Sequence, residues 1–263
     1  MKKLITTIGS YEIYNLLNQL KGGDELKNFL DGKFSVDTND EFADKYHSII
    51  SVKDGQIVAT YRYIPNAELN CTNTEKYYNF SDIYHQEIRP RAVELGRSAA
   101  KKEDARALFS ILKGGLGPLI SYNKKYNNMN YLVGQVTLQD DVFDEVSQLL
   151  VFSAFWQSFG CNIATPKTPS FSKKDLEKLY FLPYDEGGKL QLESLLSKRG
   201  KPKPTLFYFY KDLVRKGIRV GLPTRNDSLK GNEMWFCVSV NDFTEKATQQ
   251  YLSADFNENA FAF

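Results

Sequence analysis

The chain has 263 residues, of which 34 are Lys or Arg and 32 are Asp or Glu, so its formal net charge is +2. Hydrophobic residues make up 42% and aromatic residues 14%, enough to bury a large core, which excludes a disordered chain. The near-neutral charge argues against a dedicated nucleic-acid binder, which normally carries a broad basic excess.

The numbers and positions of the cysteines and histidines further limit the classes of protein that the chain can belong to. Three separated cysteines (Cys71, Cys161 and Cys237) and two histidines favour neither a disulfide framework nor a metal centre. The N-terminus lacks the apolar region of a signal peptide, and the longest nearly apolar run, residues 149–156, is too short to span a bilayer. We therefore expect a soluble, cytoplasmic protein without a bound metal.

The first third of the chain predicts helices followed by a hairpin. Apolar residues at helical spacing predict a helix within residues 11–20, and a second helix follows Asp24. Residues 46–52 and 57–64 then alternate as two strands around Asp54-Gly55, a strong hairpin signal.

The middle of the chain alternates strands and helices. Residues 66–90 predict a loop with a short helix from about residue 81. A strand at 93–99 and a helix at 103–113 follow. The next predicted elements are a strand at 131–138 and a helix capped by Asp141. The glycine-rich residues 113–117 are typical of a helix C-cap and tight turn rather than a phosphate cradle.

The C-terminal third is less regular. Residues 166–204 predict an irregular stretch with a helical turn at 172–179. A helix at 205–216, a strand at 233–240 and a frayed or partner-dependent tail at 255–263 follow. The whole pattern predicts one α/β domain around a mixed sheet.

A charged pair within one predicted strand is the main chemical signal. Glu94 and Arg97 are costly to bury in a strand unless they have partners or a function. A bulge at Gly96 would bring the two side chains together and free backbone N–H groups that could hold the developing negative charge of a thioester oxygen. The alternative is an exposed edge strand with an ordinary ion pair, and the residues alone favour neither.

The stretch E-L-G-R-S at residues 94–98 resembles the core of the acyl-carrier-dependent N-acyltransferases of the ornithine-lipid type, often labelled hemolysins. These GNAT-like proteins are related to acyl-homoserine-lactone synthases. Further segments fall in the family order: residues 40–47, residues 57–65 (I-V-A-T-Y-R-Y-I-P), residues 131–138 (Y-L-V-G-Q-V-T-L) and, loosely, residues 200–252. The core of the resemblance covers about residues 33–160.

The resemblance implies a GNAT-like acyltransferase fold over residues 1–263, with a mixed, mostly antiparallel sheet flanked by helices. It implies transfer of a fatty acyl group from acyl carrier protein to the amine of an amino acid. Glu94 would accept the proton, and backbone N–H groups of residues 96–98, that is Gly96, Arg97 and Ser98, would hold the oxyanion. Arg62 and Arg97 would bind the acceptor carboxylate or the pantetheine phosphate, and Asp40 and Asp44 would order these arginines or meet the acceptor ammonium.

The donor follows from a missing motif. Coenzyme-A-dependent relatives open the helix after this strand with a glycine-rich loop that binds pyrophosphate. Residues 101–105 contain no glycine here, which favours a phosphopantetheine thioester on acyl carrier protein over acyl-CoA, with no bound cofactor.

Carrier proteins are acidic, and one basic stretch could dock them. Its only acid is Asp212, and its basic residues are Lys198, Arg199, Lys201, Lys203, Lys211, Arg215, Lys216 and Arg219. A solvated basic face is equally compatible, and contact with anionic lipid at the inner membrane is a third use. Two alternative functions stay open: an acyl-homoserine-lactone synthase, and a catalytically silent lipid- or carrier-binding module on the same fold.

Overall fold

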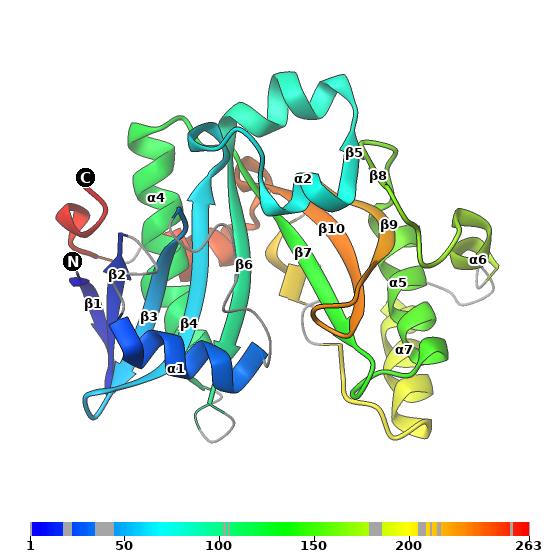
Figure 1. The fold of residues 1–263 in the computed structure, drawn as a ribbon, viewed down its shortest axis with the longest axis horizontal. Helices are drawn as coiled ribbons and strands as arrows, with labels where there is room; N and C mark the ends of the chain where they lie inside the picture. Colours follow the sequence, from blue (N-terminus) through cyan, green and yellow to red (C-terminus); the bar gives the residue numbers. More distant parts are fainter. Residues whose placement is uncertain are drawn as a thin grey trace. The chain divides into compact units, whose positions relative to one another are not determined.

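The computed structural model describes residues 2–17, 23–34, 45–101, 104, 106–178, 186–204, 209–210, 212–214, 217–252 and 255–262. The chain divides into two compact units, each built from separate stretches (Figure 1). The first contains Met1–Asn70, Arg91–Leu132 and Phe243–Phe263, and the second contains Cys71–Pro90 and Val133–Asp242.

The first unit contains an antiparallel sheet of five consecutive neighbours. Its strands, in spatial order, are β1 (Lys2–Ile8), β2 (Tyr11–Leu16), β3 (His47–Lys53), β4 (Gln56–Pro65) and β6 (Ala92–Ala100). The predicted β3–β4 hairpin is confirmed. Asp54 and Gly55 have φ angles of 51° and 77°, the positive values that a two-residue hairpin turn needs.

Helices cover both faces of this sheet. Leu26 and Leu30 of α1 (Gly23–Phe34) pack with Ile50 of β3 on one face. The next strand residue, Ser51, points the other way, and its hydroxyl lies 3.2 Å from that of Ser110 in α3 (Arg106–Ile111). The predicted helix after Asp24 is therefore confirmed, and α3 confirms most of the helix at 103–113.

Two predictions for the first unit are wrong. Residues 11–16 form β2 instead of a helix, because Ile13 and the buried polar Asn15 alternate toward the core as a strand requires. The glycines after α3 do not cap it: the chain continues as a π-helical turn (Leu112–Leu116) and then as α4 (Gly117–Tyr126). A methyl group at Gly115 would overlap Ile49, so this glycine allows the turn to lie against the sheet.

The C-terminal tail also differs from its prediction. After α9 (Glu245–Ala247), residues 258–260 form a 3-10 turn, and Phe261 is 2% exposed. The backbone N–H of Asn257 donates to the carbonyl of Ile5 at 3.0 Å. The tail is therefore packed on β1 instead of frayed.

The second unit contains a sheet in the order β7 (Tyr131–Gln139), β10 (Gly231–Ser239) and β9 (Ile218–Asn226), with β9 and β10 antiparallel. A separate antiparallel pair joins β5 (Tyr78–Phe80) to β8 (Ala164–Pro166). The Tyr78 hydroxyl lies 3.1 Å from the backbone carbonyls of Leu222 and Glu233. It accepts a hydrogen bond from the backbone N–H of Trp235 at 3.0 Å. This one buried phenol ties the small pair to both β9 and β10.

The helices of the second unit partly match the predictions. They are α2 (Asn73–Tyr77), a π-helical turn (Tyr84–Ile88), α5 (Glu145–Phe159), α6 (Lys173–Glu177) and α7 (Glu186–Lys198). The cap of α5 is Asp144 and not Asp141, since the Asp144 carboxylate accepts the backbone N–H of Ser147 at 3.0 Å. Strand β9 and helix α7 were not predicted. The predicted helix at 205–216 falls largely outside the described residues.

No helix among the described residues is both long and apolar enough to cross a membrane. In the same part of the chain, His, Cys, Asp and Glu side chains do not gather in groups of three that could hold a metal ion.

Candidate active site

Glu94 is the third residue of β6, and its side chain is buried. It is 3% exposed, and its Oε1 accepts a 2.6 Å hydrogen bond from the Tyr46 hydroxyl. Tyr46 is fully buried directly before β3. A distance this short is typical of a hydroxyl group that donates to a carboxyl oxygen. The Tyr46 hydroxyl thus fixes the position of the buried Glu94 side chain.

Arg62 lies next to this pair. It pairs with Gly96 in the β4–β6 register, two residues from Glu94, so Arg62, Gly96 and Glu94 share one face of the sheet. The Arg62 guanidinium is 4.2 Å from the centre of the Tyr46 ring, a cation–π contact, and the residue is 5% exposed. A Cβ atom at Gly96 would lie 3.3 Å from Arg62 Nε. The glycine thus leaves room for the guanidinium.

The register of β4 and β6 contains the predicted bulge. Thr60 faces Ala99 and Arg62 faces Gly96, so two residues of β6 (Arg97 and Ser98) lie opposite the single Tyr61. The bulge thus follows Gly96 directly. A bulge leaves one residue outside the regular ladder, and its N–H can then point to another acceptor. Ser98 is exposed, and the Arg97 side chain lies outside the described residues.

Sequence reasoning missed Tyr46 and His47. The His47 ring lies 5.3 Å from the Tyr63 ring, and burial lowers the pKa of His47, which keeps the imidazole neutral at pH 7. The Tyr63 hydroxyl in turn donates to Asn15 Oδ1 at 3.0 Å. The signal for Tyr46 was available: one step before β3, it continues the alternation that places its side chain on the same face as Arg62.

The other predicted residues are distributed differently. Asp40, Asp44, Lys211, Arg215 and Lys216 lie outside the described residues. Three of the predicted docking cations are paired with acids from elsewhere in the chain: Arg199 and Lys201 reach Asp144 at 2.9 and 3.3 Å, and Lys203 reaches Glu193 at 2.8 Å.

Asp144 is held ionised by these contacts. The backbone N–H of Ser147, together with Arg199 and Lys201, holds the pKa of the Asp144 carboxyl well below its usual range. Of the two remaining docking residues, Lys198 is exposed and Arg219 is half-buried on β9. A carrier-docking role for the stretch stays a prediction.

A match to a known protein family includes the residues of the candidate site. Residues 13–107 match the family model described as an acetyltransferase (GNAT) domain. This segment is therefore similar to a GNAT domain. It runs from β2 into α3 and includes Tyr46, Arg62, Glu94 and Gly96. The predicted GNAT-like α/β fold, with a mostly antiparallel sheet flanked by helices, is confirmed, as is the acyltransferase class. The narrower ornithine-lipid family is not distinguished by this match.

Solved structures show more distant likeness. The CoA-dependent acyl-homoserine lactone synthase BjaI with MTA is 9% identical, with a TM-score of 0.40, over 94% of this chain and 86% of that one. The aminoglycoside 6′-N-acetyltransferase from Enterococcus faecium is 11% identical, with a TM-score of 0.40, over 86% and 96% of the two chains. No curated protein matches the chain.

Proposed function

We propose that the protein transfers a fatty acyl group from acyl carrier protein to the amine of an amino acid. The observation that carries this proposal is the buried Glu94 carboxylate held by Tyr46 beside Arg62, at a bulge in β6. Amine acylation needs a base, because the nucleophile must be a neutral amine. A cation next to that base, and the backbone N–H groups of the bulge after Gly96, suit the oxygen that becomes negative.

In the proposed step, the amine nitrogen attacks the thioester carbonyl, a C–N bond forms, the C–S bond breaks and the phosphopantetheine sulfur of the carrier leaves as a thiolate. Glu94 accepts the proton that the nitrogen loses, directly or through a water molecule. The N–H groups of residues 96–98 stabilise the tetrahedral oxyanion. Arg62 binds the acceptor carboxylate or the pantetheine phosphate, a role for which a bidentate guanidinium is suited. Asp40 and Asp44 remain proposed partners of these arginines.

The carrier-bound donor is supported by the glycines after α3. In a coenzyme A site, glycines near this helix would form a loop whose N–H groups hold pyrophosphate. Gly115 and Gly117 are instead packed inside continuous helix, where added methyl groups would overlap Ile49 and the Tyr251 carbonyl. We expect kcat/KM with an acyl carrier protein thioester to exceed that with acyl-CoA of the same chain length by at least about tenfold. Equal values in a purified assay would remove the carrier from the proposal.

Contact with anionic membrane lipid belongs to the same proposal. Phe109 is 58% exposed on α3, and a pocket of about 450 Å³ beside it is lined by Ile8, Tyr11, Arg106 and Lys113. Arg106 and Lys113 are exposed and form no ion pair with another described residue. An aromatic side chain between two cations suits the interface of an anionic membrane. This membrane patch consists of Arg106, Phe109 and Lys113.

The central test is mass spectrometry of lipids from bacteria that express the wild-type chain, Glu94→Gln or Glu12→Gln. Glu12 is an exposed residue of β2, so its variant makes the same chemical change away from the site. We expect a new N-acyl amino acid in wild type and Glu12→Gln, and a loss of about 10²-fold or more in Glu94→Gln. The mass of the product names the acceptor.

Other outcomes separate the alternatives. An acyl-homoserine lactone in place of an acyl amino acid would favour the synthase. Folded protein that binds acyl carrier protein without any turnover would favour a silent binding module. A product that is equally abundant in wild type and Glu94→Gln would rule out Glu94 as the base.

A further inference from the structure

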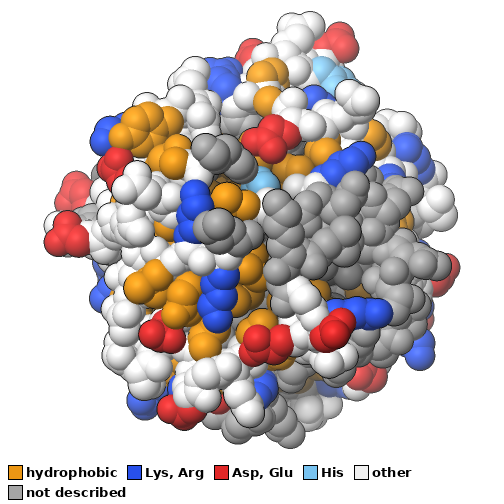
Figure 2. Space-filling model, turned by 60° about the vertical axis from the view of Figure 1, so that its left-hand side comes forward, with side chains coloured by type: hydrophobic (Ala, Val, Ile, Leu, Met, Phe, Trp, Pro, Cys, Tyr) orange, Lys and Arg blue, Asp and Glu red, His pale blue; other side chains and the backbone are white. Residues whose placement is uncertain are grey.

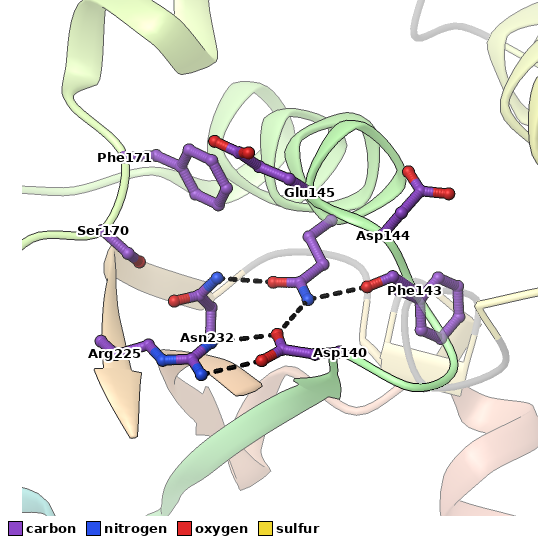
Figure 3. Close-up of a pocket in the computed structure, with 9 residues that line it drawn as sticks. Asp140, Phe143, Asp144, Glu145, Ser170, Phe171, Arg225 and Asn232 are labelled. Carbon is purple, nitrogen blue, oxygen red and sulfur yellow. Dashed lines mark hydrogen bonds and ion pairs between the residues drawn. The ribbon is translucent and has the colours of Figure 1, made fainter. Parts of the chain in front are cut away.

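The second unit contains a polar pocket of about 360 Å³ at the start of α5 (Figure 3). Asp140 enters it from the end of β7, Arg225 from β9 and Asn232 from β10, and Ser170 and Phe171 come from the segment before α6. All of these residues belong to one compact unit. None of these residues takes part in the proposed acyl transfer.

A chain of hydrogen bonds fixes the polar groups of this pocket. Arg225 contacts the Asp140 carboxylate at 2.7 and 3.0 Å, and Gln148 Nε2 donates to Asp140 at 2.9 Å and to the Phe143 carbonyl at 2.8 Å. Hydrogen bonding from Arg225 lowers the pKa of Asp140, so this carboxylate only accepts. The amide nitrogen of Gln148 must therefore face Asp140.

The same logic orients Asn232. Because Gln148 Nε2 is directed at two acceptors, Gln148 presents Oε1 on its other side, and Asn232 Nδ2 donates to it at 2.6 Å. Asn232 must then direct Oδ1 away from Gln148, toward the Ser170 side of the pocket, as Figure 3 shows. The ion pair at one end of the chain thus determines which atom Asn232 presents at the other end.

Two of these oxygens lack a protein partner. Asn232 is only 7% exposed, and neither its Oδ1 nor the Ser170 hydroxyl forms a hydrogen bond with another described residue. Leaving a buried polar atom without a hydrogen-bond partner is energetically unfavourable. Two such atoms on one side of one pocket indicate a ligand that supplies hydrogen-bond donors.

One carboxylate that lines the pocket has no ion-pair partner among the described residues. Asp140 pairs with Arg225, and Asp144 pairs with both Arg199 and Lys201. Glu145 is exposed and has no ion-pair partner among the described residues, and its carboxylate extends beside the Phe171 ring in Figure 3. The partial positive charge of the α5 N-terminus is opposed by both of its first acids, Asp144 and Glu145.

We propose that this pocket binds a primary alkyl ammonium group. Asn232 Oδ1 and the Ser170 hydroxyl accept two of its N–H donors, the Glu145 carboxylate supplies negative charge at the edge of the pocket, and the Phe171 ring packs against the alkyl stem. We refer to it as the ammonium pocket. The ligand class includes free amines and the side-chain end of a basic amino acid, since both present the same group.

The test is calorimetric titration of the full chain with n-butylammonium chloride and with butyltrimethylammonium chloride at matched ionic strength. The second ion has the same charge and stem but no N–H donor. We expect saturable binding of n-butylammonium and at least about tenfold weaker binding of the trimethylated ion, because hydrogen bonds to a charged group are lost. Ser170→Ala and Glu145→Gln should each weaken n-butylammonium binding about three- to tenfold.

Glu177→Gln, an exposed change on α6, is the matched control and should bind like wild type. Asn232→Leu should abolish binding, but it also disrupts the network with Gln148. The conclusion therefore depends on Ser170→Ala and Glu145→Gln, with unfolding temperatures checked for all variants. Equal affinity for the two ions, or no saturation up to about 100 mM, would overturn the proposal and leave the pocket to water.

Discussion

Tyr46 provides a hydrogen-bond partner for the buried Glu94 side chain of β6. Burying an ionised acid is unfavourable unless donors replace its water, and the Tyr46 hydroxyl supplies a 2.6 Å bond to Glu94. The same ring lies 4.2 Å below the Arg62 guanidinium. One phenol thus contacts both the proposed base and the proposed anion-binding group, so we propose it as a positioning residue for the proposed reaction.

Tyr46→Phe tests this role. The ring and its contact with Arg62 remain, but the ionised form of Glu94 loses a donor, and an acid that loses such a donor becomes harder to ionise. We expect kcat/KM to fall about tenfold and the acid limb of its pH profile to move to higher pH. Steady-state assays from pH 5 to 9 measure both changes.

Tyr126→Phe is the matched control for this variant. It removes a 2.7 Å bond from an exposed tyrosine to Glu258, far along the chain from the site residues. Its profile should match wild type. A Tyr46→Phe enzyme that loses rate equally at every pH would contradict an effect through the ionisation of Glu94.

At this scale the sequence predicted the acid but not its partner. Glu94 is recognisable in the sequence because burying a carboxylate inside an apolar strand usually lowers the stability of the fold. Tyr46 is not, since aromatic residues are ordinary core and its partner is 48 positions away. Arg62 was assigned through a family resemblance, and its place opposite Gly96 depends on a strand register that the sequence does not specify.

Among the elements, hairpins with strong turn chemistry were predictable and strands with mixed faces were not. Asp54-Gly55 sets the β3–β4 turn whatever surrounds it. β1 was missed because only Ile5 of its seven residues is buried, so no alternation is visible. Gly114 and Gly115 predicted the end of a helix, but a glycine also permits close packing, and here contact with Ile8 and Ile49 decides the structure.

Helix α3 and its π-helical extension bear the membrane patch, which gives an element-scale prediction. Phe109→Ser should weaken binding to phosphatidylglycerol vesicles about tenfold, because a buried aromatic side chain contributes about 1.5–3 kcal/mol. Vesicle sedimentation measures the partition coefficient. On the face drawn in Figure 2, charges of both signs lie among hydrophobic side chains, so net charge alone is not expected to drive binding.

Ile83→Ser is the comparison for this variant. Ile83 is 49% exposed in the second unit and follows Asp82, so the substitution removes a similar apolar surface without flanking cations. It should bind vesicles like wild type. If Phe109→Ser and Ile83→Ser bind equally, or if wild type binds zwitterionic vesicles as well as anionic ones, the patch is not a lipid contact.

At the scale of the whole molecule, the two ends of the chain meet within the first unit. Lys3 Nζ donates to the Ala262 carbonyl at 2.6 Å, and Asn15 Nδ2 donates to the Ala260 carbonyl at 2.9 Å. The sequence predicted a frayed or partner-dependent tail because residues 255–263 show no regular hydrophobic period. What holds it is a few contacts between residues about 250 positions apart, which local patterns do not reveal.

Phe261→Ala measures how much this closure contributes. Phe261 is 2% exposed and lies 5.5 Å from the Tyr122 ring, so its removal leaves a cavity between the tail and α4. We expect the free energy of unfolding to fall by about 3–5 kcal/mol, measured by urea denaturation. Phe256→Ala, at a half-buried position of the same tail, should cost clearly less. Equal, small losses for both variants would mean that the tail detaches without unfolding the sheet it covers.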